Sequence, residues 1–139
     1  HRARLSGPLL DRIDIHCEVP QVRFRHLKEG GTGETSVQVR GRVNNARAVQ
    51  SGRFKGAAGK GFFSNSRMGS REIKELCRIT KEGERLLEAA VERLGFSARA
   101  YTRVLKVART IADLEGEADI APHHISEAVQ YRTLDRPIS

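Results

Sequence analysis

Aromatic residues are scarce in this chain of 139 residues, which contains no Trp, two Tyr and five Phe. Because the hydrophobic content is also only 38%, we expect a core of small aliphatic side chains, as helical domains often have. No apolar run approaches the roughly 18 residues that a membrane span requires, and no signal-peptide pattern opens the chain. These absences favour a cytoplasmic helical domain with one core.

Cysteine is rare as well, and Cys17 and Cys77 each stand alone. Two isolated cysteines without a secretory signal are typical of a reduced, intracellular protein. The histidine pair His123 and His124, taken with the other histidines and the cysteines, has no recognisable metal-ligand spacing. The sequence therefore predicts no metal site.

A phosphate-binding loop is missing. Such a loop needs a Gly, four residues, then Gly-Lys-Ser/Thr, so that backbone N–H groups surround the phosphates. The pair Gly59-Lys60 has Phe54 in place of the first Gly and Gly61 in place of the hydroxyl residue. No apolar strand ending in paired acids is present to hold Mg²⁺. The chain is not expected to hydrolyse ATP alone.

The net charge is +8, which is compatible with nucleic acid, an acidic partner or a phosphate ligand. The chain has no block of consecutive Lys or Arg, and acidic residues are interleaved with the basic ones through most of the C-terminal half. Charge alone therefore does not identify nucleic acid as the partner.

Most of the chain has the pattern of short helices. We expect a helix over 36–50, a mobile Gly-rich loop over 51–69, a short helix capped by Ser70, a helix from Thr80 to Gly95, one from Ser97 to Gly116, and a last helix opened by Pro122. Ahead of them, apolar residues alternate with polar ones from Ile13 to Val19, which predicts a strand ended by Pro20. The fold class is mainly α, a small helical bundle preceded by a short strand.

The helix from Ser97 carries Arg99, Arg103, Lys106 and Arg109 within about a third of its circumference. The plain interpretation is a solvated basic face on an amphipathic helix. Arg99 is different, because it lies in the first turn, where the helix end is already partly positive. A cation in that place favours a nearby anion.

Two motifs together carry a family resemblance. Leu-Ser-Gly-Pro-Leu-Leu-Asp-Arg-Ile-Asp occupies residues 5–14, and Ser-Ala-Arg-Ala-Tyr-Thr-Arg-Val-Leu-Lys-Val-Ala-Arg-Thr-Ile-Ala-Asp-Leu-Glu-Gly occupies residues 97–116. The pair resembles the C-terminal part of magnesium-chelatase-like AAA+ ATPases, including competence-associated bacterial members. The resemblance implies three segments: the end of the AAA+ core over 1–27, a linker over 28–35 and a helical lid over 36–139. Because the chain begins within such a motif, we expect it to be part of a longer protein.

The resemblance also implies roles for two arginines. Arg12 matches the arginine finger, which reaches the ATP held by a neighbouring subunit of a ring, usually a hexamer. Arg99 matches the sensor-2 arginine, which contacts the phosphates bound by its own subunit's core. The alternative is an ordinary ion pair, Arg12 with Asp11 or Asp14 and Arg99 with Glu92. ATP and Mg²⁺ are the cofactors implied for the full-length protein, and none is expected for this chain alone.

A DNA-binding helical module is the alternative function. Its contacts would come from Arg103, Lys106 and Arg109 on the basic helix face, or from Lys55, Lys60 and Arg67 in the Gly-rich loop, where Phe62 and Phe63 could stack on bases. Direct phosphate binding would weaken steeply with salt. A chelatase subunit acting on a porphyrin is a third possibility, for which the sequence supplies no tetrapyrrole or metal-ion site.

Overall fold

The computed structural model describes residues 5–31, 33–55 and 64–132, and it is almost entirely helical in these ranges. The helices are α1 (Gly7–Arg12), α2 (Phe24–Glu29), α3 (Ser36–Arg53), the 3-10 turn η3 (Asn65–Arg67), α4 (Ser70–Leu76), α5 (Lys81–Leu94), α6 (Ala98–Glu115) and α7 (Pro122–Gln130). None of the helices in these ranges has both the length and the apolar content to cross a membrane.

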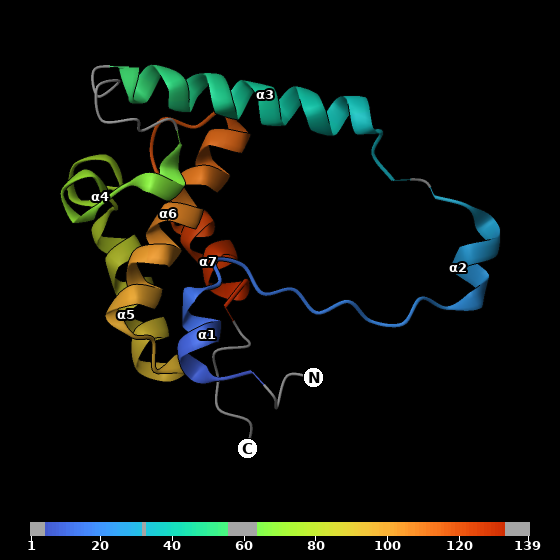
Figure 1. Ribbon diagram of the computed structural model, residues 1–139, viewed down its shortest axis with the longest axis horizontal. Helices are drawn as coiled ribbons and strands as arrows, with labels where there is room; N and C mark the ends of the chain where they lie inside the picture. Colours follow the sequence, from blue (N-terminus) through green and yellow to red (C-terminus); the bar gives the residue numbers. More distant parts are fainter. Residues whose placement is uncertain (1–4, 32, 56–63, 133–139) are drawn as a thin grey trace.

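Helix α6 is the centre of the bundle and contacts α1, α3, α4, α7 and η3. Helix α7 packs against both α5 and α6, and α1 lies against the N-terminal end of α6 (Figure 1). The core is aliphatic, and its least exposed apolar members are Leu87, Ala100, Val104, Ala108, Ala112, Ile125 and Ala128. A mainly helical bundle with a small-residue core, as the sequence predicts, is confirmed.

The helix ends follow local chemistry. Thr80 and Ser97 cap α5 and α6 by accepting hydrogen bonds from the N–H groups of Gly83 and Ala100, both at 3.1 Å. Gly95 ends α5 in the left-handed conformation at φ 66°, which a residue with a Cβ adopts only at a cost. These ends agree with the sequence prediction. The cap of α4 differs by one position, because Gly69 and not Ser70 precedes its first turn.

The strand predicted from Ile13 to Val19 is wrong. This segment has no regular secondary structure, and Ile13, Ile15 and Val19 are exposed. The one buried side chain is His16, which the alternating pattern assigns to the solvent face. A strand needs a neighbour for its backbone hydrogen bonds, and here the N–H of His16 donates instead to the carbonyl oxygen of Tyr131, at 2.6 Å.

Both edges of the predicted Gly-rich loop belong to packed structure. Helix α3 continues to Arg53, and Phe54, Asn65 and Met68 are buried. The middle of that loop, including Lys60, Phe62 and Phe63, lies outside the described residues. The predicted linker over 28–35 likewise contains the last turn of α2 and the cap of α3, where Thr35 and Gln38 exchange side chain-to-backbone hydrogen bonds.

Candidate functional site

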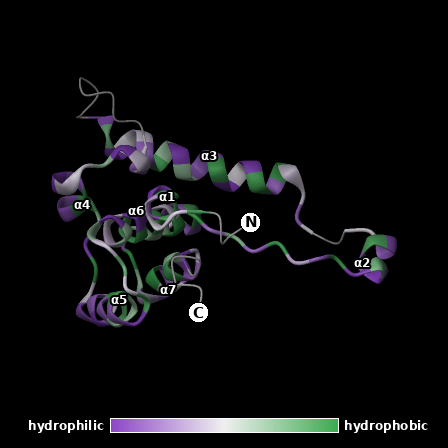
Figure 2. Ribbon diagram, turned by 60° about the horizontal axis from the view of Figure 1, so that its bottom comes forward, coloured by the Kyte–Doolittle hydropathy of each residue, from purple (hydrophilic) through white to green (hydrophobic). Residues whose placement is uncertain are grey.

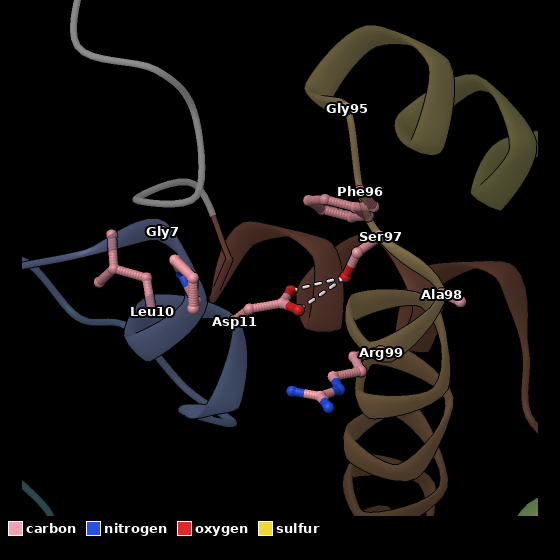
Figure 3. Close-up of a pocket in the computed structure, with 9 residues that line it drawn as sticks. Gly7, Leu10, Asp11, Gly95, Phe96, Ser97, Ala98 and Arg99 are labelled. Atoms are coloured by element: carbon pink, nitrogen blue, oxygen red, sulfur yellow. Dashed lines mark hydrogen bonds between the residues drawn. The ribbon is translucent and has the colours of Figure 1, made fainter.

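A pocket of about 540 Å³ lies between α1 and the N-terminus of α6. Its wall consists of residues from α1 and from the connection into α6, namely Gly7, Pro8, Leu10, Asp11, Gly95, Phe96, Ser97, Ala98 and Arg99 (Figure 3). The two motifs that carry the family resemblance are more than eighty residues apart in the sequence, and the structure brings them together at this pocket.

Ser97 connects the two helices that form the pocket. Its hydroxyl accepts the capping hydrogen bond from Ala100 and donates to the Asp11 carboxylate, whose two oxygens lie 2.7 and 2.8 Å away (Figure 3). A second contact follows six residues later, where Arg103 of α6 pairs with Asp14. The first turn of α6 is therefore held at a fixed distance from α1.

Arg132 holds α1 from the other side. Its guanidinium is fully buried and donates to the carbonyl oxygens of Leu10, Asp11 and Ile13, at 3.4, 3.3 and 2.5 Å. These carbonyls belong to the end of α1, where a helix lacks internal partners and carries partial negative charge. His16 adds a hydrogen bond from Nε2 to the carbonyl oxygen of Leu10, at 2.9 Å. The sequence predicted neither role. For Arg132 the reason is that its partners in α1 lie more than a hundred residues away in the chain.

Arg99 lies in the first turn of α6 and is exposed. Its side chain extends from α6 toward α1 (Figure 3), and it forms no ion pair with any residue in the described ranges. The first turn of α6 contains no acidic residue. A guanidinium beside the partly positive start of a long helix is suited to an anion, and the planar group can bind two oxygens of a phosphate.

Arg12 is the last residue of α1 and is also exposed. It forms no ion pair with the described part of the chain, and it does not line the pocket that contains Arg99. The two acids next to it have other partners. Asp11 accepts from Ser97, and Asp14 pairs with Arg103. The ion pairs considered as alternatives for Arg12 and Arg99 are therefore not formed within the described residues.

The basic face predicted for α6 is wrong for Arg109. Arg109 is only 4% exposed and donates to the carbonyl oxygens of Glu117 and Ala118 beyond the end of the helix, both at 2.8 Å. Its guanidinium also pairs with the buried Asp113 one turn further along α6, so its charge is compensated inside the fold. Arg103 pairs with Asp14, and Lys106 donates to the carbonyl oxygen of Ser66.

Arg109 belongs to a buried polar cluster that joins α3, η3 and α6. Asp113 is 2% exposed and accepts from Arg53 through both carboxylate oxygens, at 2.6 and 2.8 Å, from Asn65 at 2.9 Å and from Arg109 at 3.2 Å. Burial of the carboxylate opposes its ionisation, but the hydrogen bonds from Arg53 and Asn65 outweigh that effect. The pKa of Asp113 therefore lies below its ordinary value.

The structure groups His123 and His124 with Glu115, which sequence spacing did not suggest. Nδ1 of His124 accepts from the N–H of Ala121 at 2.8 Å, so Nε2 carries the proton of the neutral ring and donates to Glu115 at 2.6 Å. A metal bound to that Nε2 would require the proton to be on Nδ1. That proton would then face the N–H of Ala121, so two donors would point at each other. The group therefore acts as a cap of α7, and hydrogen bonds from both histidines lower the pKa of Glu115.

The family model for the C-terminal part of magnesium chelatase subunit ChlI matches residues 33–132. The chain belongs to this family. Competence protein ComM of Haemophilus influenzae is 46% identical over 96% of the chain, and protein YifB of Escherichia coli is 42% identical over the same share. A protein of Mycobacterium tuberculosis, Rv2897c, is 30% identical over 93% of it.

The chain spans about a quarter of the length of these relatives, at 25% in each case. The family model begins at residue 33 and so contains α3 to α7 with Arg99 and Arg132, whereas Arg12 lies before it. The relatives extend the match over nearly all of this magnesium-chelatase-like chain.

Proposed function

We propose that this chain is the lid portion of a magnesium-chelatase-like AAA+ ATPase and that it senses ATP bound by a core supplied from elsewhere in a longer protein. The observation that carries the proposal is the exposed Arg99 at the first turn of α6, directed into a pocket and without an ion pair among the described residues. Arg99 would bind phosphate oxygens of the nucleotide in its own subunit.

Arg12 would act on a different nucleotide. It ends α1, which Ser97 and Arg132 hold against the bundle, and it is absent from the wall of the Arg99 pocket. We place it as the arginine finger that stabilises charge on the γ-phosphate in the neighbouring subunit of a ring homo-oligomer. Movement of the lid against the core after hydrolysis would then be transmitted to both sites.

ATP and Mg²⁺ fit this chain only in part. Arg99 and the start of α6 are suited to phosphate oxygens, whereas the sequence contains neither a phosphate-binding loop nor paired acids at a strand end for Mg²⁺. When bound by the core, Mg²⁺ would neutralise phosphate charge. The residues of this chain would orient the phosphates and add positive charge from the lid side. By the same argument, the isolated chain is expected not to hydrolyse ATP. A role in competence is proposed from the name of one relative only.

ATP hydrolysis by the full-length protein that carries this chain tests the proposal. Arg12→Ala is expected to lower kcat by about 10³-fold or more, since an arginine finger contributes that much. Arg99→Ala is expected to lower kcat and raise KM together. Arg85→Ala, which removes an exposed arginine of α5, is the matched control and should leave both constants unchanged.

Mixing experiments distinguish the two arginines. A subunit with Arg12→Ala, mixed with a subunit whose phosphate-binding loop is disabled, should recover part of the activity, because one mixed interface retains both functional parts. Arg99→Ala should not recover in the same mixture, because it disables its own subunit's nucleotide. Recovery by neither variant, or full activity of Arg99→Ala alone, would refute the assignment.

A further inference from the structure

The positive charge of this protein is concentrated in one stretch. Residues 21–69 contain ten Lys and Arg but only two Glu, whereas the remaining ninety residues contain fifteen basic and fifteen acidic residues. The whole net charge of +8 therefore belongs to the stretch that includes α2, α3 and η3, and the rest of the chain is neutral. The basic face of α6, which the sequence suggested for DNA, does not contribute to this excess.

Helix α3 is the most regular part of this stretch. It has four arginines and no acidic residue over its 18 residues. Only its C-terminal half is anchored, through Ala46, Gln50 and Arg53. Its N-terminal half projects past the bundle toward α2, as two views of the molecule show (Figure 1 and Figure 2), and hydrophilic and hydrophobic residues alternate along the helix. A long basic helix is thus presented to a partner on its open side.

Two arginines of α3 share one side of the helix. Arg40 and Arg47 are seven residues apart, which places them within about 20° of each other and ~10 Å apart along the axis. Both are exposed, and neither forms an ion pair with a described residue. Between and beside them on this side are Ser36, Asn44 and Ser51, which are polar and uncharged, and the exposed Val43 lies at the edge of this side. We call Ser36, Arg40, Asn44, Arg47 and Ser51 the α3 stripe.

The other two arginines of α3 are already used. Arg42 pairs with Glu34, and Arg53 is bound to the buried Asp113. The stripe therefore contains the cations of this helix that are available to an external anion. With α3 parallel to a duplex, the ~10 Å separation would span about three base-pair steps, at roughly 3.4 Å of helix axis for each step.

The stripe leads into a pocket of about 380 Å³ between α3, η3 and α6, which has apolar walls from Val43, Ala46 and Leu114 and a set of polar residues. The polar residues that line it are Arg47, Gln50, Ser64, Asn65, Ser66 and Thr110, and no carboxylate is among its lining residues. Lys106 lies at the same place, with its ammonium group on the carbonyl oxygen of Ser66. Hydroxyl and guanidinium donors without a competing carboxylate are suited to phosphate oxygens.

From this arrangement we propose that the α3 stripe and the pocket beside Arg47 bind the phosphodiester backbone of a nucleic acid. A nucleic acid fits better than an acidic protein because two available cations lie at the centre of the stripe and α3 has no acidic residue to compete with them, whereas the centres of protein interfaces are depleted of charge. The contacts are to phosphates, so binding is expected to be independent of sequence. The surface is separate from the Arg99 pocket and requires no ATP.

The test measures binding of the 139-residue chain to a fluorescent 30-nucleotide single strand and to the matching duplex, by anisotropy over a range of salt concentrations. Arg40→Gln with Arg47→Gln should weaken binding by about tenfold or more near 0.1 M salt. It should also make the slope of log K against log [salt] shallower by about 2, or roughly 0.9 for each lost phosphate contact on the duplex. Replacing both residues by Lys should restore most of the affinity, because the charge is kept.

The matched control is Arg85→Gln with Arg93→Gln, which removes the same charge from the exposed face of α5. It should leave the slope unchanged, and circular dichroism should show equal helix content in all variants. Equal weakening by the control, or an unchanged slope in the α3 variant, would overturn the proposal. So would an absence of DNA binding by the wild-type chain at low salt. If the α3 variant instead altered self-association in sedimentation velocity, the surface would be a protein interface.

Discussion

At the scale of single residues, the two cysteines have opposite surroundings. Cys17 is exposed, whereas Cys77 is 4% exposed and packs in the core beside Met68. Burial raises the pKa of the Cys77 thiol to about 11, so the reactive thiolate is almost absent from this residue at neutral pH.

This difference predicts selective labelling. A thiol reagent at pH 7.5 should modify one cysteine in the native chain and two in denaturant, as counted by mass spectrometry. In the Cys17→Ser variant the native chain should remain unlabelled on the same timescale. Rapid native labelling of Cys77 in that variant would show that the core opens around α4.

Ser97 is the second residue with a specific local role, because it both caps α6 and binds Asp11. Ser97→Ala should lower the free energy of unfolding by about 1–2 kcal/mol, from the lost cap and the lost hydrogen bond to the Asp11 carboxylate. Urea denaturation measures this value. Ser70→Ala is the control, because Ser70 is exposed at the start of α4 and does not cap that helix. Equal destabilisation by both variants would contradict the role given to Ser97.

At the scale of elements, α1 depends on contacts from the other end of the described chain. It has six residues, none of them buried, and a helix of that length is not stable by itself. Ser97 of α6 and Arg132 after α7 supply its external partners. The position of Arg12 at the end of α1 therefore depends on Arg132.

Removing that support should release α1. Arg132→Met is expected to increase the rate of trypsin cleavage after Arg12 by about tenfold or more, because each lost hydrogen bond from a charged donor contributes about 1.5–3 kcal/mol. Arg103→Met, which breaks only the partly exposed pair with Asp14, should have a smaller effect. If the two variants were cleaved at the same rate, Arg132 would not be the main anchor.

At the scale of the whole molecule, the cluster around Asp113 joins α3 to the bundle. The folded-state pKa of Asp113 lies below its ordinary value, so the cluster stabilises the fold above the unfolded pKa of about 3.9. This contribution is lost as the pH falls through the lower, folded-state pKa. Acidification below about pH 4 should therefore destabilise the protein.

Asp113→Asn tests this at neutral pH. It should lower the free energy of unfolding by about 3–5 kcal/mol, because Arg53 and Arg109 would lose their buried counter-charge, and the stability of the variant should fall less steeply with acid. Glu34→Gln is the control. Its pair with Arg42 is exposed, and stability should hardly change. If the stability of Asp113→Asn still fell steeply with acid, the pH dependence would come from other carboxylates.

The helices and their ends could be predicted from local sequence. The residues that begin or end the helices do so through contacts within three or four residues of the chain. They use hydrogen bonds and backbone conformations that each residue type favours wherever it occurs, as at Thr80, Gly95, Ser97 and Pro122. The prediction of a strand over 13–19 was wrong because a strand also depends on distant residues. Alternation of apolar and polar residues shows which side chains a strand would bury, but it does not show whether a neighbouring strand exists. Here the backbone N–H of His16 donates to the carbonyl oxygen of Tyr131 instead.

The sequence by itself determined the helical class, the main helix ends, the missing phosphate-binding loop and the two motifs that indicate the family. Only the tertiary structure decided which arginines are available. Arg109 and Arg132 are buried and Arg53 is partly buried, and all three are held by hydrogen bonds, whereas Arg12, Arg99, Arg40 and Arg47 stay exposed. The physical reason is that an arginine pairs with whichever acceptor is near it in the folded structure, and the distance along the chain does not determine which one that is. A carboxylate such as Asp113 lies sixty residues from Arg53 in the chain and 2.6 Å from it in the fold.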